Sequence, residues 1–220
     1  MSLVALVPMK GHSERVPKKN LRLMAGRPLF HWITEALLEA SSVDEVVVDT
    51  DADEIEQAVH EAFPTVGVHR RSPHLHGDRI PMHDVVADFA GSTQHDHVLQ
   101  THSTNPLLTS RTIDKAIRAY LDSQDHESLM SVTSWHSRFF FADGRPVNHD
   151  PTVLLRTQDL EPLLEENSNI YISRRDAIIN SGRRVGSHPL LFEIDASEAV
   201  DIDDQFDFRI AEFLLSERHG

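Results

Sequence analysis

The hydrophobic and polar positions of this chain follow two alternating periods, one typical of buried strands and one typical of amphipathic helices. Short apolar runs predict strands over residues 3–8, 45–50, 66–69, 97–100 and 128–134. Apolar positions at helical spacing predict helices over residues 28–40, 51–62, 82–90 and 110–121, with Pro28 in the first turn. Strand and helix in turn indicate an α/β fold with a mostly parallel, doubly wound sheet covered on both faces. Sheets of this kind bind ligands beyond the carboxyl ends of their strands.

This alternation stops in the second half of the chain. Residues 138–157 have no helical period and carry the turn signal Ala142-Asp143-Gly144 between apolar runs, so they predict a β-rich hairpin. The three phenylalanines at 139–141 need burial, either against the main body or a second subunit, or as an ordinary core strand. The last expected elements are strands over residues 169–172 and 190–194 and an amphipathic helix over 204–216.

The length of 220 residues suits one main domain over residues 1–220, from which residues of about 136–172 form the excursion. The sequence has no cysteine, which excludes disulfides and thiolate chemistry and agrees with a reducing compartment. It also has no apolar run of about 18 residues, so neither a membrane span nor a signal peptide is expected. We therefore expect a cytoplasmic protein without membrane contact.

Charge narrows the choice of partner. The chain has 35 Asp and Glu against 21 Lys and Arg, a net charge of -14, which argues against nucleic-acid binding. A basic cluster directly after the first strand is a local exception, formed by Lys10, Arg15, Lys18, Lys19, Arg22 and Arg27. A strand-to-helix loop rich in cations can hold phosphate or carboxylate groups, although neither standard nucleotide fingerprint is present. The alternative is a solvated basic surface.

The same loop carries a resemblance to a known family. Residues 8–20 (PMKGHSERVPKKN) and 25–29 (AGRPL) resemble the opening signature of the acylneuraminate cytidylyltransferase family. Further segments are similar to motifs of that family in the same order: residues 46–55 (VVVDTDADEI), 71–78 (RSPHLHGD), 103–107 (STNPL), 156–160 (RTQDL), 166–172 (ENSNIYI) and 200–207 (VDIDDQFD). The resemblance thus extends over almost the whole chain.

The resemblance implies a Rossmann-like nucleotidyltransferase fold with a small β-rich dimerisation arm, and a homodimer. The implied reaction transfers CMP from CTP to the anomeric hydroxyl of a nonulosonic (sialic-type) acid, a nine-carbon keto acid sugar, and releases diphosphate for surface polysaccharide biosynthesis. The implied nucleotide-binding residues are Lys10, Gly11, Ser13, Arg15, Lys19, Asn20, Arg71 and Asp78. Glu14 and Arg15 depart from the family's pattern in this loop, and Met82 stands where related enzymes place a serine near the base.

Asp201 and Asp203 form a second candidate group. Carboxylates spaced two apart in an extended segment point the same way, which suits two oxygen ligands of one hard cation. The resemblance makes both residues ligands of Mg²⁺ and, with Lys19, catalytic residues. The alternative is an acidic turn before the last helix, with Asp203 or Asp204 as its cap.

The sugar acid carries a carboxylate, so its pocket needs a cation and some polar partners. By the resemblance the cation is Arg156, on an arm that reaches across a dimer. The polar partner is His102 or Gln100, according to the register of the match, with Asn167 and Tyr171 as further lining residues unless Tyr171 is core. The histidine pairs near residues 74–76 and 95–97 are expected to be polar surface rather than a zinc site, and Trp32 and Trp135 to be core.

Two other functions remain open at this point. One is a related sugar-acid nucleotidyltransferase that uses the eight-carbon acid Kdo. The other is a catalytically weak relative that binds a nucleotide as a dimeric scaffold. The retained Lys19, Arg71, Asp201 and Asp203 favour an active enzyme.

Overall fold

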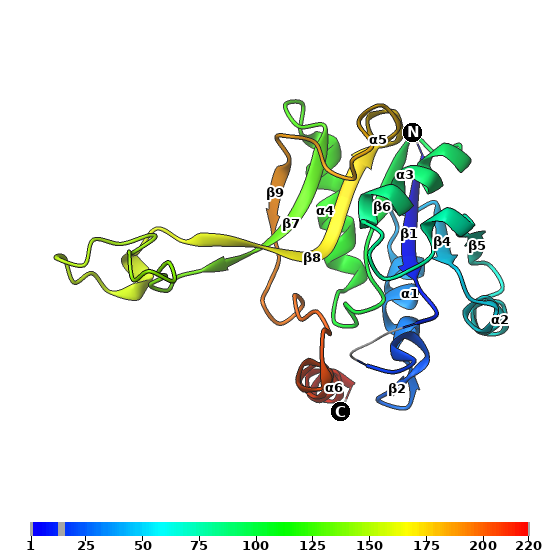
Figure 1. Ribbon diagram of the computed structural model, residues 1–220, viewed down its shortest axis with the longest axis horizontal. Coiled ribbons are helices and arrows are strands. Elements are labelled where there is room, and N and C mark those ends of the chain that lie inside the picture. The colour runs from blue at the N-terminus through cyan, green and yellow to red at the C-terminus, as the bar shows by residue number, and fades with distance from the viewer. Residues whose placement is uncertain (1, 13–15, 220) are drawn as a thin grey trace.

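The computed structural model describes residues 2–12 and 16–219, and its centre is one sheet of seven strands in the order β5-β4-β1-β6-β8-β7-β9 (Figure 1). The strands are β1 (Leu3–Met9), β4 (Glu45–Thr50), β5 (Gly67–Arg70), β6 (His97–Gln100), β7 (Ser128–Trp135), β8 (Leu163–Arg174) and β9 (Leu190–Glu193). Within the described sheet, β8 alone runs against the other strands. A separate ribbon pairs β2 (Leu23–Met24) with β3 (Arg27–Pro28). The expected mostly parallel α/β sheet is confirmed.

Helices cover both faces of this sheet. They are α1 (Leu29–Glu39), α2 (Asp53–Ala62), α3 (Met82–Ser92), α4 (Ser110–Asp122), α5 (Arg175–Ser181) and α6 (Gln205–His219), with short 3₁₀ turns η1 (Lys19–Leu21), η2 (Pro73–Leu75) and η3 (Thr157–Asp159). Alternate residues of β1 point to opposite faces. Ala5 and Val7 pack with α1, α2 and α4, whereas Val4 and Leu6 pack with α3 and α5. Burial on both faces explains why this strand is apolar without alternation.

A third apolar cluster attaches α6 to the body. Ile202 and Phe208 pack there with Met24 and Trp32, and the Trp32 indole donates a hydrogen bond to the Met24 carbonyl oxygen at 3.2 Å. The expectation that Trp32 is a core residue is therefore confirmed. The outer face of α6 is not polar, as the outer face of the expected amphipathic helix would be, since Phe206 is 61% exposed and Phe213 62% exposed.

Beyond the sheet, β7 and β8 lead into a long two-stranded arm that projects from the body (Figure 1). The expected turn is present: Gly144 has φ +87°, and the Phe141 N–H donates to the Arg145 carbonyl oxygen at 2.8 Å. Phe140 is 57% exposed and Phe141 50% exposed, so the prediction of an ordinary core strand is wrong. Trp135, at the root of the arm, is 44% exposed rather than core. An arm two strands thick has no interior in which such side chains can be buried.

β8 bends where it passes from the arm into the body. Ser168 adopts φ 57°, and the pairing of β7 with β8 shifts between Met130 and Val132. The Ser131 hydroxyl fills the gap, because it accepts from the Ile170 N–H at 2.8 Å and donates to the Asn167 side-chain oxygen at 2.6 Å. One strand therefore belongs to the arm before the bend and to the central sheet after it.

Candidate active site

A cleft of about 510 Å³ lies at the carboxyl ends of β1 and β6, the edge of the sheet to which the β1 arrow points in Figure 1. Six segments of the described chain reach it: the loop after β1, the segment from Arg71 to the first turn of α3, the loop after β6, the bend of β8, the segment before β9 and the segment before α6. The residues that line it include Lys10, Lys19, Asn20, Arg71, Asp78, Met82, His102, Ser168, Arg184, Asp201 and Asp203. This is where an α/β sheet of parallel strands is expected to bind a ligand.

Hydrogen bonds join the loop after β1 to its neighbours. Asn20 donates to the Lys10 carbonyl oxygen at 2.9 Å and accepts from the Ser103 hydroxyl at 2.6 Å. The Lys19 ammonium donates to the Ile202 carbonyl oxygen at 2.7 Å. The loop is thus tied both to the segment after β6 and to the segment that carries the two aspartates.

Two other predicted nucleotide residues face each other across the cleft. The Lys10 ammonium lies 2.5 Å from a carboxylate oxygen of Asp78, and this hydrogen bond lowers the pKa of Asp78 below its ordinary value. Gly11 is in the same loop but does not line the cleft, and its N–H donates to a carboxylate oxygen of Asp51 at 2.7 Å. Ser13 and Arg15, together with Glu14, lie outside the described residues.

Arg71 is held by a buried carboxylate. Its Nε and Nη2 lie 2.6 and 2.5 Å from one oxygen of Asp49, whose other oxygen lies 2.9 Å from Nδ1 of His69. Asp49 is completely buried, and a buried carboxylate is tolerated only where it is paired. Asp49 therefore fixes the Arg71 guanidinium at the wall of the cleft.

Asp201 and Asp203 both line the cleft, while Ile202 between them is completely buried in the cluster under α6. The expected alternation of an extended segment is confirmed. Burial raises the pKa of the Asp201 carboxyl, and the charge of Asp203 adds to this effect against a hydrogen bond from Thr104. Among the described residues, Oδ1 of Asp201 is buried without a hydrogen-bond partner.

The cap of α6 is a different aspartate. The Asp204 carboxylate accepts from the N–H groups of Phe206 at 2.6 Å and Asp207 at 3.1 Å, as an N-cap residue does. The described chain brings no three His, Cys, Asp or Glu side chains together as a metal cluster. Two carboxylates nevertheless fit Mg²⁺, which usually takes one or two protein carboxylates and completes its shell with water and substrate phosphates.

The predicted sugar-acid residues separate into two groups. His102 lines the cleft, whereas Gln100 is 1% exposed and lies behind it, with its amide nitrogen 2.9 Å from Nε2 of His102. Asn167 and Tyr171 are buried and do not line the cleft. Arg156 lies on the arm with its side chain 72% exposed, and it does not line the cleft of its own chain either.

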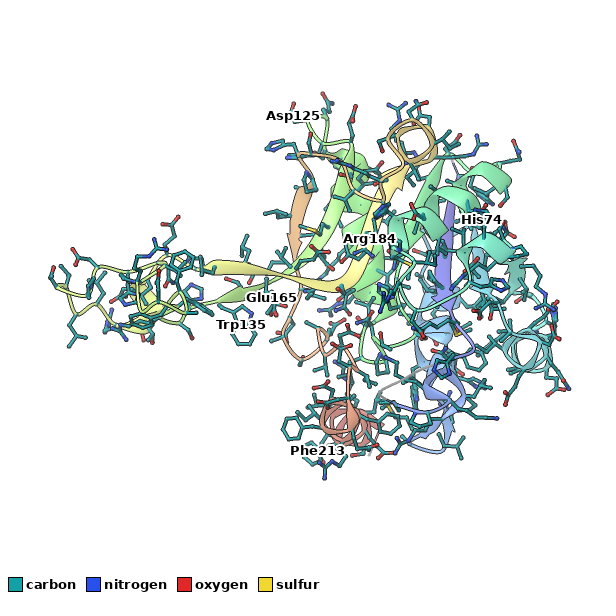
Figure 2. The ribbon with its side chains drawn as sticks, viewed as in Figure 1. His74, Asp125, Trp135, Glu165, Arg184 and Phe213 are labelled. Carbon is teal, nitrogen blue, oxygen red and sulfur yellow. The ribbon has the colours of Figure 1, made fainter. Side chains whose placement is uncertain are left out.

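Arg184 lines the cleft, although the sequence analysis did not identify it. It lies between α5 and β9, and Figure 2 places it in the body, apart from Trp135 and Glu165 at the root of the arm. Its guanidinium stacks 3.7 Å from the centre of the Tyr171 ring and donates to the side-chain oxygen of Gln100 at 2.8 Å. An arginine in an irregular segment gives no spacing signal, so only contacts across the fold reveal it.

Charge and burial keep His102 neutral. Burial, with smaller contributions from the charges of Arg184 and Lys19, lowers the pKa of His102 to about 3. The cleft therefore combines cations, a carboxylate pair and an uncharged imidazole, a set suited to an anionic substrate and a divalent cation.

Comparison with known proteins gives the family of this arrangement. The cytidylyltransferase family model matches residues 4–213. The chain belongs to the cytidylyltransferase family. A CMP-N,N'-diacetyllegionaminic acid synthase from Legionella pneumophila is 30% identical over 234 residues, covering 98% of this chain and 97% of that protein.

Other cytidylyltransferases are similar over different shares of their length. An N-acylneuraminate cytidylyltransferase from Oncorhynchus mykiss is 31% identical over 96% of this chain, but the match covers 49% of that protein. The chain likewise spans about half the length of its relatives from Danio rerio. Among solved structures, a CMP:2-keto-3-deoxy-manno-octonic acid synthetase complexed with CTP has the same fold, with a TM-score of 0.76 at 18% identity over 99% of this chain and 100% of that one. No described helix is both long and apolar enough to span a membrane.

Proposed function

We propose that this cytidylyltransferase transfers CMP from CTP to a nonulosonic acid. The observation that carries the proposal is the meeting of Lys19 with Asp201 and Asp203 in one cleft, where a hydrogen bond of 2.7 Å from Lys19 to the Ile202 carbonyl oxygen joins the two groups. The anomeric hydroxyl oxygen of the sugar forms a bond to the α-phosphorus of CTP, and the bond from that phosphorus to the bridging oxygen breaks. Diphosphate leaves with the electron pair, and the hydroxyl proton passes to solvent.

The cationic residues would hold the triphosphate and offset the charge that develops on it. Lys10, Lys19 and Arg71 surround the nucleotide end of the cleft, and phosphate oxygens would compete with Asp78 for Lys10. Fixed cations stabilise a phosphoryl transition state because they do not need to reorganise during the reaction. The hydrogen bonds of Asn20 to Lys10 and Ser103 would keep this loop in place for in-line attack.

Asp201 and Asp203 would hold Mg²⁺ together with phosphate oxygens of the substrate. A bound Mg²⁺ supplies Lewis-acid stabilisation of the α-phosphate and a template for the sugar hydroxyl. The unpartnered, buried Oδ1 of Asp201 supports this assignment, because a bound cation would stabilise a buried carboxylate oxygen that has no hydrogen-bond donor.

A diphosphate-release assay tests the proposal directly. Purified protein with CTP, Mg²⁺ and a panel of nonulosonic acids should release diphosphate with at least one of them, and more slowly with UTP, GTP or ATP. Turnover restricted to the eight-carbon acid Kdo would assign the chain to that substrate instead. Folded protein that is inactive with every sugar and nucleotide would contradict the proposal and leave a nucleotide-binding relative without turnover.

Asp201 and Asp204, three residues apart, provide a matched comparison for the proposed metal site. Asp201→Ala should lower Mg²⁺-dependent turnover by about a thousandfold or more and leave unfolding little changed, because the lost carboxylate would hold the Mg²⁺ that stabilises the reacting phosphate. Asp204→Ala should instead lower the free energy of unfolding by about 1 kcal/mol and keep most of the activity, because Asp204 caps α6. Full activity in Asp201→Ala would refute its role as a metal ligand.

We also propose that the arm forms a homodimer and carries Arg156 to the cleft of the second copy. Leu154 is 91% exposed and Phe141 50% exposed, and apolar side chains gathered on a projecting arm are typical of an interface. The exposed Arg156 guanidinium, paired only with Asp159 among the described side chains, supports its use between subunits.

Sedimentation velocity tests the dimer. The double variant Phe141→Asp and Leu154→Asp should sediment as a monomer, whereas Leu38→Asp, which changes an exposed leucine on α1, should not alter the state of association. A wild-type monomer at micromolar concentration would contradict the proposed interface.

A further inference from the structure

We propose that Arg184 and His102 together bind the carboxylate of the sugar acid, and that Gln100 between them sets which nitrogen of His102 carries the proton. The inference rests on the proposed function. The sequence analysis named His102 or Gln100 as the polar partner of the sugar acid, but it did not indicate Arg184, which would be a second cation beside the Arg156 brought by the arm of another copy. It is carried by one chain of contacts, in which Arg184 donates to Gln100 at 2.8 Å and the Gln100 amide lies 2.9 Å from His102.

Strand order places Arg184 at the acceptor end of the cleft. Lys10 and Lys19 follow β1, and Arg71 follows β5, on one side of the sheet order β5-β4-β1-β6-β8. Arg184 instead contacts Gln100 at the end of β6 and Tyr171 in β8, on the other side. A sugar acid that attacks the α-phosphate from that side would present its carboxylate to Arg184 rather than to the triphosphate cations.

The guanidinium is already held in place. It stacks on the Tyr171 ring at 3.7 Å, its Nη1 donates to Gln100, and its Nη2 lies 3.3 Å from a carboxylate oxygen of Glu166. Arginine has five N–H donors, and these contacts use two of them. A preorganised guanidinium with free donors binds a carboxylate at a low entropic cost.

The same contacts fix the imidazole of His102. Arginine can only donate, so the Gln100 oxygen must face Arg184 and the Gln100 NH₂ group must face Nε2 of His102. Nε2 is then the acceptor, and the proton of the neutral ring lies on Nδ1. No hydrogen bond from Nδ1 to another described residue is present, so this N–H remains for a ligand.

A neutral N–H donor beside a fixed cation suits a carboxylate better than a sugar hydroxyl. The His102 N–H and the Arg184 guanidinium both donate, and a carboxylate accepts at each of its oxygens. The low pKa of His102, about 3, agrees with a ring that donates without becoming charged. His102 is therefore a binding residue in this arrangement, and Gln100 is a positioning residue.

Steady-state kinetics with matched arginine variants tests the inference. Arg184→Gln should raise the KM for the sugar acid by about 10- to 100-fold, because one charge-assisted contact is lost, and should change the KM for CTP less than about threefold. Arg184→Lys should show a smaller rise, since it keeps the charge without the planar fork. Arg183→Gln, at the exposed neighbouring position that does not line the cleft, is the control and should behave as wild type.

A substrate analogue identifies the group that Arg184 binds. Wild type should prefer the free acid over its primary amide by more than about tenfold, and Arg184→Gln should lose most of this preference. An unchanged preference, or a rise in the KM for CTP alone, would overturn the inference while the proposed function stands.

Binding and NMR measurements separate failure of the inference from failure of the proposed function. If wild type shows no turnover, titration calorimetry with the same sugar acids and CTP still compares wild type with Arg184→Gln. Binding that depends on Arg184 would support the subsite without the reaction, and no binding would overturn both the inference and the proposed function.

The tautomer of His102 can be read from ¹⁵N-histidine spectra, in which the His102 signal is the one that is missing in His102→Gln. This signal should report an Nδ1–H tautomer in wild type and a different tautomer in Gln100→Leu. An Nε2–H tautomer in wild type would refute the assigned role of Gln100.

Discussion

Gln100 and His102, two residues apart at the end of β6, take different roles because one side chain lies inside the sheet and the other faces the cleft. The sequence motif at residues 103–107 allowed either of them to meet the substrate. The structure separates the two, because Arg184 lies on Tyr171 and donates to Gln100. At the scale of single residues, the tautomer that we propose for His102 follows from these contacts.

The half-buried imidazole of His102 should make stability depend on pH. The pKa of His102 is about 3 in the folded chain, whereas an unfolded histidine has a pKa of about 6.5, so between these values only the unfolded state binds the proton. The contribution of the neutral ring to stability is therefore complete above pH 6.5 and falls as the pH decreases toward 3, by up to about 1.4 kcal/mol per pH unit. Urea unfolding at pH 7 and pH 5 should show a loss about 2 kcal/mol larger in wild type than in His102→Gln.

An exposed histidine provides the control for this measurement. His60→Gln, on the outer side of α2, should lose as much stability as wild type between the two pH values. Equal losses in wild type and His102→Gln would contradict a buried neutral ring.

At the scale of elements, the sheet strands and the longer helices were predictable, whereas the short helix α5 and the extent of the arm were not. The strand at residues 97–100 was predicted with the bounds that the structure has, and its Val98 and Leu99 are buried on opposite faces of the sheet. The seven-residue helix α5 was not predicted, since two turns are too short to establish a period. Trp135 was expected in the core because the sequence cannot show that β7 extends past the sheet into an arm.

The junction of β1 and α2 gives a prediction at this scale. A Cβ atom at Gly11 would lie 2.6 Å from Cβ of Ala52, the residue that caps α2, which is closer than two such atoms can approach. Gly11→Ala should displace the loop that carries Lys10, raise the KM for CTP several-fold and lower the free energy of unfolding by about 1–3 kcal/mol. Ala52→Gly in the same chain should restore much of both losses, as kinetics and urea unfolding would show. If Gly11→Ala alone behaved as wild type, the close contact between Gly11 and Ala52 would be contradicted.

At the scale of the whole molecule, the site depends on positive charge gathered within an acidic protein. The net charge of -14 was evident from composition, and so was the basic segment after the first strand. The arrangement of the site was less accessible, because Arg71, Arg184 and Asp201 meet only through the order of the strands. The sequence motifs named the loop after β1, His102 and the two aspartates, whereas the position of Arg184 in the cleft required the folded chain.

Charge repulsion should make the fold more stable in salt. Raising NaCl from about 20 mM to about 300 mM shortens the Debye length from roughly 20 Å to about 6 Å and screens repulsion among the excess carboxylates. The unfolding temperature should rise by about 2–4 °C for each kcal/mol of repulsion relieved, and KCl should have the same effect. If the unfolding temperature fell with both salts, attractive ion pairs would outweigh the repulsion among the carboxylates.

The bend of β8 also determines how assembly relates to the cleft. Ser168 lines the cleft, and the strand that continues from it into the arm is fixed by Ser131 and Asn167 rather than by a loose linker. A partner that binds the arm therefore contacts the same strand that forms part of the wall of the cleft. A partner that rotated the arm at its bend would also displace Ser168 in that wall.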